Sequence, residues 1–219
     1  MIPRRYFERG ATSPQKGFMS SAKNNGFSLV EAMIAVSILM IAAAITFATL
    51  GPAFQQARVS AGYNTTLMML RQARQLSVDN RKTYIVNFVA PQTIQIQQVD
   101  NGVVGAVIRT AVLPQDVQFS NVSGIPTANS QTPDNMGTGG KAIEFDIGVA
   151  GGSATQLWFF PDGSARDINN NTNNGIVYVA RLGDLYSSRA ITMFGAAGRV
   201  RGWRLYPPTA AGNPIWKQQ

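Results

Sequence analysis

The chain has 219 residues, enough for one domain with a substantial core and an accessory element. It contains neither cysteine nor histidine, which excludes disulfides, thiol nucleophiles, Cys/His zinc sites and histidine-centred acid–base catalysis. Its formal charge of +8 is concentrated at the two ends, because residues 1–26 carry a net +4, residues 27–175 a net −1 and residues 176–219 a net +5.

The first predicted element is an apolar helix near the N-terminus. No residue is charged in 32–50, and with residues 27–30 the segment would be about 36 Å long as a helix, against a bilayer core of about 30 Å. A buried core helix is the alternative, but such helices are usually amphipathic, and here only Ser37, Thr46 and Thr49 interrupt the apolar surface. We therefore expect a membrane span with a cytoplasmic N-terminus, because the basic residues precede it.

Glu31 lies at the start of this apolar run. A carboxylate inside a span costs roughly 2.5–3.5 kcal/mol on insertion scales, so it marks a functional position that needs a partner. A secretory signal cut near residues 42–44 would leave this glutamate unexplained.

The stretch "GFSLVE" resembles the processing site of type IV prepilins and type II secretion pseudopilins. The resemblance implies that a prepilin peptidase cuts between Gly26 and Phe27 on the cytoplasmic side and methylates the new amine of Phe27. It also implies that Glu31 pairs with the N-terminal amine of a neighbouring subunit in the filament. An amine and a carboxylate are tolerated in apolar surroundings only as a pair, which agrees with this role. The leader is long, and Met19 is an alternative start.

Past Pro52, which is expected to kink or loosen the helix, residues 53–81 continue with helical periodicity. We expect Arg71 and Arg74 on a solvated face, and a weak stretch at 62–66. The pattern then alternates with period two, which predicts antiparallel strands and an α+β fold, a long N-terminal α-helix packed on an antiparallel β-rich head. The expected strands are 84–89, 93–99, 103–113, 142–147, 155–160, 176–182, 190–194 and 199–206. Residues 123–140 are predicted to be a long exposed loop.

The head is most similar to the GspH/FimT family of minor pseudopilins. The similarity rests on "LRQARQLSVDNRKTYIVNF", "LWFFPDGSA" and "GRVR", while the 123–140 loop and the chain after Tyr206 fall outside the family pattern. The expected organisation is a leader at 1–26, a transmembrane and filament-core helix at 27–56, a head at 57–206 and an irregular tail at 207–219.

The strand "GRVRGWR" carries a DNA-binding hypothesis. Arg199, Arg201 and Trp203 would share one face, where guanidiniums neutralise phosphates and an indole stacks on a base. The motif resembles the Gly-Arg-x-Arg of DNA-binding FimT proteins of natural transformation. Secretion-type members also end with a Gly-Arg turn before a final strand, so both roles stay open.

Two further groups of residues are candidate sites. Glu144 and Asp146 share a strand face and could be paired catalytic carboxylates or a cation site, but we favour a solvated face. The Asp/Asn-rich segment 162–174 could hold calcium, but it lacks a recognisable ligand spacing, and a turn and loop explain it as well.

The sequence thus predicts a minor pilin or pseudopilin rather than an enzyme, with no catalytic residue, metal or cofactor. The expected partners are other pilin or pseudopilin subunits, prepilin peptidase, an inner-membrane assembly platform, membrane lipid before assembly and, in the alternative, DNA. The expected location is the bacterial inner membrane with the head periplasmic, and then a type IV pilus or a type II secretion pseudopilus.

Overall fold

The computed structural model describes residues 27–145, 155–209 and 212–219. Gly26 and Asp146 therefore lie outside the described residues. The chain divides into two compact units, with the boundary between Ala48 and Thr49. One helix, α1 (Leu29–Asn80), runs through this boundary, and the strands all belong to the second unit.

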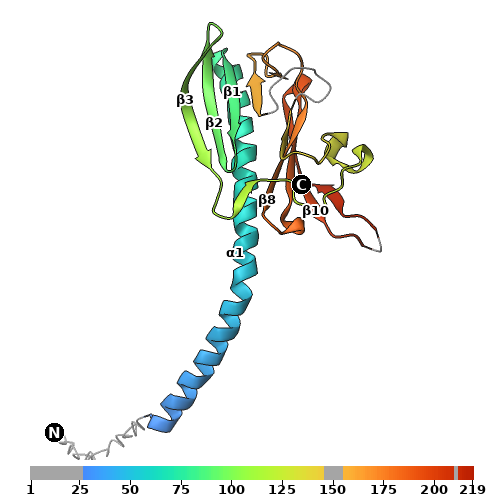
Figure 1. Cartoon of the computed structure of the whole chain (residues 1–219). Coiled ribbons are helices and arrows are strands. Elements are labelled where there is room, and N and C mark those ends of the chain that lie inside the picture. The colour runs from blue at the N-terminus through green and yellow to red at the C-terminus, as the bar shows by residue number, and fades with distance from the viewer. Residues whose placement is uncertain (1–26, 146–154, 210–211) are drawn as a thin grey trace, which may run out of the picture. The chain divides into compact units, whose positions relative to one another are not determined.

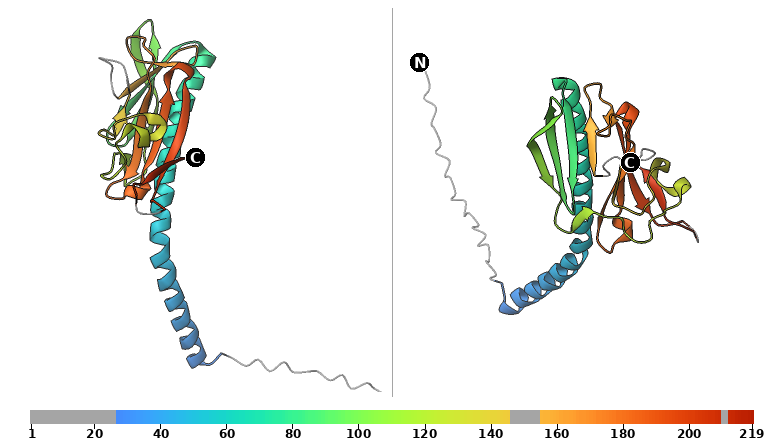
Figure 2. Two further views of the ribbon diagram at one scale, coloured as in Figure 1. Left: turned by 90° about the vertical axis from the view of Figure 1, so that its right-hand side faces the viewer. Right: turned by 45° about the horizontal axis from the view of Figure 1, so that its top comes forward.

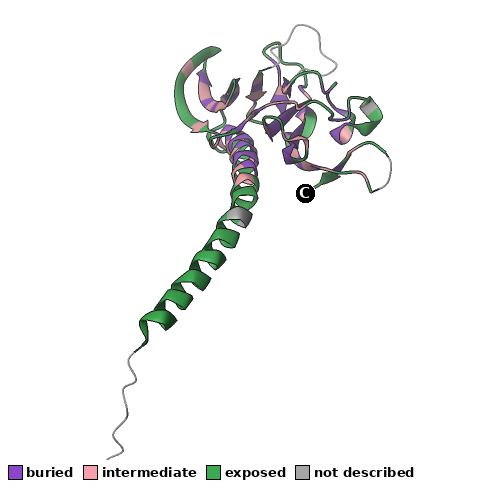
Figure 3. Ribbon diagram, turned by 60° about the horizontal axis from the view of Figure 1, so that its bottom comes forward, coloured by how far each residue is buried: buried purple, intermediate pink, exposed green. Residues whose placement is uncertain are grey.

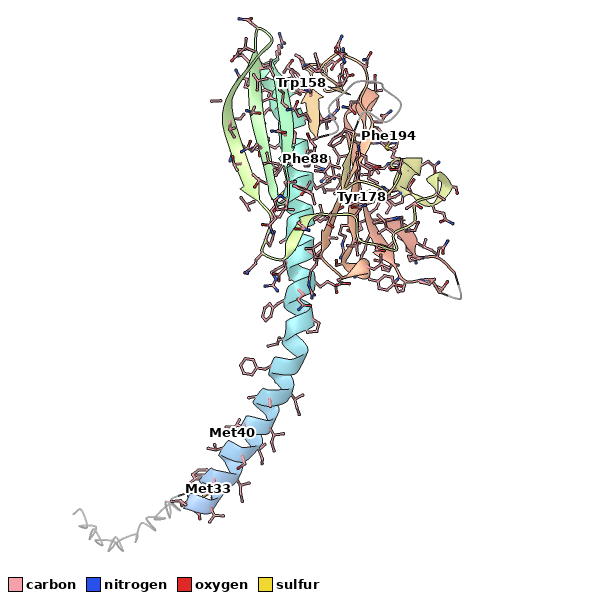
Figure 4. All side chains as sticks on the ribbon, in the orientation of Figure 1. Met33, Met40, Phe88, Trp158, Tyr178 and Phe194 are labelled. Atoms are coloured by element: carbon pink, nitrogen blue, oxygen red, sulfur yellow. The ribbon has the colours of Figure 1, made fainter. Side chains whose placement is uncertain are left out.

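In the first unit, α1 is an apolar helix whose described side chains are exposed (Figure 3). Met33 and Met40 stand out from its surface (Figure 4). Its two interior hydroxyls, on Ser37 and Thr46, each donate to the carbonyl four residues earlier, at 2.8 Å. These bonds satisfy the polar groups within the helix itself. By length and composition the helix is able to cross a membrane, and its most apolar window has a mean hydropathy of 2.4.

In the second unit, α1 continues without interruption through Pro52 and through 62–66, where the sequence predicted weakening. Gly62 instead allows a close approach, because a Cβ there would lie 2.8 Å from Cγ1 of Val117. The hydroxyl of Thr66 donates to the Gly62 carbonyl at 3.0 Å. This stretch is therefore a packing position of the helix.

The first sheet of the described head has the strand order β3-β2-β1-β6-β7, and every pair is antiparallel. Isoleucines of β2 point inward and alternate with half-buried glutamines, as the period-two pattern predicted. β3 forms one edge, and most of its residues are exposed. The strands are β1 (Thr83–Val89), β2 (Thr93–Asp100), β3 (Val103–Val112), β6 (Gln156–Phe159) and β7 (Ala165–Arg166).

The second sheet has the order β11-β10-β9-β8-β4 within the described residues, and the short β5 also pairs with β8. β8 is almost wholly buried, which explains its continuous apolar sequence. The strands are β4 (Val117–Phe119), β5 (Ile143–Glu144), β8 (Gly175–Arg181), β9 (Arg189–Phe194), β10 (Arg199–Tyr206) and β11 (Ile215–Gln218). Single 3-10 turns are η1 (Asn129–Gln131), η2 (Pro133–Asn135), η3 (Leu185–Ser187) and η4 (Gly195–Ala197).

The two sheets lie on either side of the head part of α1 and share one core with it (Figures 1 and 2). Near its centre, the ring of Phe88 lies 5.3 Å from that of Phe119 and 5.4 Å from that of Phe145. Gly202 lets β10 approach the helix, since a Cβ there would lie 1.5 Å from the hydroxyl of Tyr63. Core side chains come from α1 (Val59, Tyr63, Leu70), the first sheet (Val86, Ile94, Leu157) and the second (Val179, Ile191, Met193).

The fold class predicted from the sequence is confirmed, and two segments of the head differ from their predicted structure. The chain after Tyr206, predicted to be irregular, contains β11, which pairs with β10 and buries Trp216. The segment 123–140, predicted to be exposed, packs Ile125 and Met136 into a second apolar cluster with Tyr178. A few buried side chains are enough to hold each segment on the sheet. The other residues can therefore be polar or small, and the composition is that of a loop.

Candidate functional site

The predicted processing site lies at the start of α1. Phe27 precedes the helix and is 83% exposed, and Glu31 lies in the first helical turn. An acidic side chain in a first turn interacts favourably with the helix dipole. Among the described residues, no side chain pairs with Glu31. Glu31 is thus an exposed carboxylate on an exposed apolar helix. Its pairing with a neighbouring amine stays a prediction.

The predicted DNA-binding row lies on β10. Arg199 is exposed, and its guanidinium lies 4.8 Å from the centre of the Phe194 ring. Arg201 instead donates to the carboxylate of Asp134 at 2.7 Å, in a largely buried ion pair. Trp203 donates its indole N–H to the hydroxyl of Thr192 at 3.2 Å. Two of the three predicted side chains are therefore engaged within the molecule.

The segment 123–140 is the cause of this engagement. It covers the face of the second sheet that bears Arg201 and Trp203, and it carries Asp134 in a left-handed backbone conformation with φ of 54°. The same carboxylate accepts a second hydrogen bond, from Thr192, at 2.6 Å. Sequence reasoning could not see this contact because Asp134 and Arg201 are 67 residues apart.

The structure instead brings Arg199 together with two arginines of α1. Arg71, Arg74 and Arg199 line a hollow of about 520 Å³, and no acidic side chain of the described residues lines it. Arg74 donates from its Nε to the carbonyl of Gly163 at 3.1 Å, which fixes its position. All three arginines are exposed, as was predicted for the two on the helix. Nothing in the spacing of the residues predicts that Arg71 and Arg74 lie beside Arg199. We call this site the arginine hollow.

Glu144 corrects a prediction. It was expected on a solvated face, but it is 8% exposed. Its carboxylate accepts hydrogen bonds from the backbone and hydroxyl of Thr138, each at 2.5 Å, and from the backbone of Lys141 at 3.1 Å. Glu144 thus holds the end of the 123–140 segment against β5. Its predicted neighbour on the strand, Asp146, lies outside the described residues.

In the segment 162–174, the acidic side chains bond within the loop. Asp162 accepts from Ser164 and Arg166, and Asp167 accepts from Asn171. No group of three or more acidic side chains gathers in the part of the chain that the structure describes. The loop contains β7 and a bridge between Arg166 and Thr172.

A buried arginine was not anticipated from the sequence. Arg189 is 2% exposed and donates to the carbonyls of Ser187 and Ser188 at 3.2 and 3.4 Å. Burial, together with the charge of Arg204 on the paired strand, lowers the pKa of Arg189 to about 10. Burial also raises the pKa of the Tyr63 hydroxyl, which faces this region. No pattern in the sequence distinguishes this buried arginine from the exposed ones.

Residues 21–47 match the prokaryotic N-terminal methylation motif. The motif supports a type IV pilin or pseudopilin. No curated protein sequence matches the chain. Two crystal structures of the type IV minor pilin FimU of Pseudomonas aeruginosa (strain PAO1), in space groups P21 and P65, are similar to it. Both are 13% identical with a TM-score of 0.41, and they cover 74% and 70% of this chain and 97% and 99% of the FimU chain.

Proposed function

We propose that the chain is a minor pilin or pseudopilin subunit that is cut between Gly26 and Phe27, methylated on the new amine and assembled into a filament. The observation that carries this proposal is the methylation motif over residues 21–47, placed on a helix that exposes apolar side chains. Glu31 in the first helical turn is the only charged residue of that helix before Arg58. Such a surface is stable in a lipid bilayer or in the core of a helical filament.

The proposal includes a topology and partners. Basic residues precede the helix, so the N-terminus stays cytoplasmic and the head lies on the periplasmic side of the inner membrane. The partners are prepilin peptidase, an assembly platform and other subunits. The pairing of Glu31 with the amine of a neighbour's first residue would replace two isolated charges by one neutral pair. Both filament classes, the type IV pilus and the type II secretion pseudopilus, fit this role.

The test is to determine the mature N-terminus by mass spectrometry after expression with a prepilin peptidase. The expected first residue is Phe27 with one added methyl group. Gly26→Val should leave the chain uncut, whereas the matched change Gly51→Val, within α1, should leave processing intact. A mature N-terminus after residue 44, as a secretory signal would give, would overturn the proposal.

A second candidate function is DNA binding, now through the arginine hollow. The specific observation is that three exposed arginines line one hollow, and no acidic side chain in the part of the chain that the structure describes lines it with them. Three phosphate contacts predict a log-log salt slope of about −2 with single-stranded DNA. Affinity of this kind is weak for one subunit, so repetition along a filament would strengthen it.

Fluorescence anisotropy with single-stranded DNA at two salt concentrations tests this second function. Arg71→Ala/Arg199→Ala should reduce the affinity and flatten the salt slope. The control is Arg109→Ala/Arg81→Ala, which removes two exposed arginines elsewhere in the head. Equal affinity of the two double variants would rule out the arginine hollow as the binding site.

A further inference from the structure

The two segments outside the family pattern meet on the outer side of the second sheet. Residues 130–132, 134 and 135 of the 123–140 segment and 213–216 of the C-terminal segment line one hollow of about 560 Å³, to which Trp203 of β10 also contributes. This volume lies within the range of small-ligand pockets, about 300–1,000 Å³. In Figure 1 the loop that bears η1 and η2 lies beside the second sheet, on the side away from α1.

The hollow has no free charge. Among the described residues, Asp134 is the one ionisable residue that lines it, and its carboxylate already binds Arg201 and Thr192. A cationic ligand would have to compete with Arg201 for this carboxylate, and an anionic ligand would find no unpaired cation in the lining. The ligand class that fits is therefore uncharged.

The lining combines two indoles with primary amides. Trp203 is half-buried and fixed by its hydrogen bond to Thr192, and Trp216 packs against the Tyr178 ring at 5.8 Å between centres. The amide side chains of Gln131, Asn135 and Asn213 are exposed and make no side-chain hydrogen bond with any described residue. Each amide offers both donors and an acceptor.

This chemistry matches a sugar. A pyranose ring has an apolar C–H face, which packs on an aromatic ring, and hydroxyls at its edge that both donate and accept. A rigid indole supplies the first contact at little entropic cost, and free amides supply the second. We propose that this hollow binds a neutral oligosaccharide, and we call it the indole pocket. The site is independent of the arginine hollow, which shares no residue with it.

The test is isothermal titration of the full-length protein in lipid nanodiscs with cellotriose, maltotriose and chitotriose. Glycoside detergents must be absent, because their headgroups are themselves sugars. We expect saturable binding of at least one trisaccharide, about tenfold weaker in Gln131→Ala/Asn213→Ala, since two hydrogen bonds are lost. Both residues are exposed, so the variant should fold normally. The matched control Gln56→Ala/Asn64→Ala removes two exposed amides of α1.

Two results would overturn the proposal. One is the absence of saturation by all three sugars at millimolar concentrations, and the other is unchanged affinity in Gln131→Ala/Asn213→Ala. If the sugars do not bind, saturable binding of an uncharged Gly-Ala hexapeptide would identify a peptide groove instead.

Discussion

Asp134 and Arg201 form an ion pair at 2.7 Å that joins the 123–140 segment to the middle of β10. The carboxylate side chain is 8% exposed and the guanidinium side chain 30%. A pair buried to this extent is weak evidence for net stability, but the removal of one partner leaves the other without compensation. The contact therefore decides both how firmly the segment is held and whether Arg201 is available to other anions.

Asp134→Asn should lower the free energy of unfolding by about 2 kcal/mol, because it leaves a partly buried guanidinium unpaired. Asparagine tolerates the left-handed backbone at this position, so the change isolates the charge. The control is Asp116→Asn, which also has positive φ but pairs with Arg58 at the surface and should cost less than about 0.5 kcal/mol. Urea unfolding of the three proteins provides the measurement, and equal losses would show that the pair does not hold the segment.

Gly202→Ala should destabilise the head by more than about 3 kcal/mol, since the new Cβ would overlap the Tyr63 hydroxyl. Gly51→Ala is the matched control, because a Cβ there meets nothing within 4 Å. In the Tyr63→Ala background, Gly202→Ala should cost less free energy of unfolding than it does in the wild type, because the hydroxyl that the new Cβ would overlap is gone. Thermal unfolding followed by circular dichroism tests this, and a simple sum of the two losses would contradict the proposed contact.

Tyr178→Phe should stabilise the protein by about 1 kcal/mol at neutral pH. The Tyr178 hydroxyl is fully buried and has no hydrogen-bond partner among the described atoms, so its removal relieves a desolvation cost. Tyr84→Phe is the contrasting change, because that hydroxyl accepts from Asn80 and donates to Gln98. It should lower the free energy of unfolding. If urea unfolding shows that both variants are more stable than the wild type, or that both are less stable, this interpretation is wrong.

The same tyrosine predicts a dependence on pH. Burial, with a smaller effect of the Glu144 charge, raises the pKa of Tyr178. Above pH 10 the unfolded chain releases this proton while the folded chain keeps it, so stability should fall by up to about 1.4 kcal/mol per pH unit. Arg189, with its lowered pKa, acts in the opposite direction. The difference between wild type and Tyr178→Phe therefore isolates the tyrosine, and it should grow from pH 9 to pH 11. A constant difference would show that Tyr178 ionises normally.

Glu31→Val should block incorporation into the filament and spare cleavage, because the amine of a neighbouring Phe27 would lose its charge partner. Ser37→Val, which changes a polar side chain of the same helix without removing a charge, should assemble normally. Immunoblots of sheared filaments and of membranes separate the two steps. Normal amounts of the Glu31→Val subunit in the filaments would show that assembly does not need the pairing of Glu31 with a neighbouring amine.

The strands with clear period-two alternation were predictable within one or two residues, as β1, β2 and β10 show. The apolar N-terminal helix was equally predictable, because no polar face interrupts its apolar surface. Short strands such as β4 and β11 were not, since their residues pair with strands fixed by long-range packing. A three-residue strand carries too little periodicity to be recognised.

Single residues of the candidate sites could be identified from the sequence, but which residues lie together in the structure could not. Arg199 was identified from its motif, yet its neighbours Arg71 and Arg74 come from a helix more than 100 residues earlier. Trp203 was assigned to an open strand face, but the 123–140 segment packs beside it and leaves it half-buried. The composition of that segment is typical of a loop. Its two large apolar side chains, Ile125 and Met136, are buried and mark the side that packs.

β3 has a practical consequence for work with the isolated protein. This ten-residue edge strand exposes Val103, Val104, Val107, Ile108 and Val112, and Arg109 is its only charged residue. One side of its backbone is open to pair with a strand of another molecule. At high concentration, outside an assembly, this edge is where unwanted association should begin. A lysine in place of Val103 or Val112 is the change to make before crystallisation is attempted.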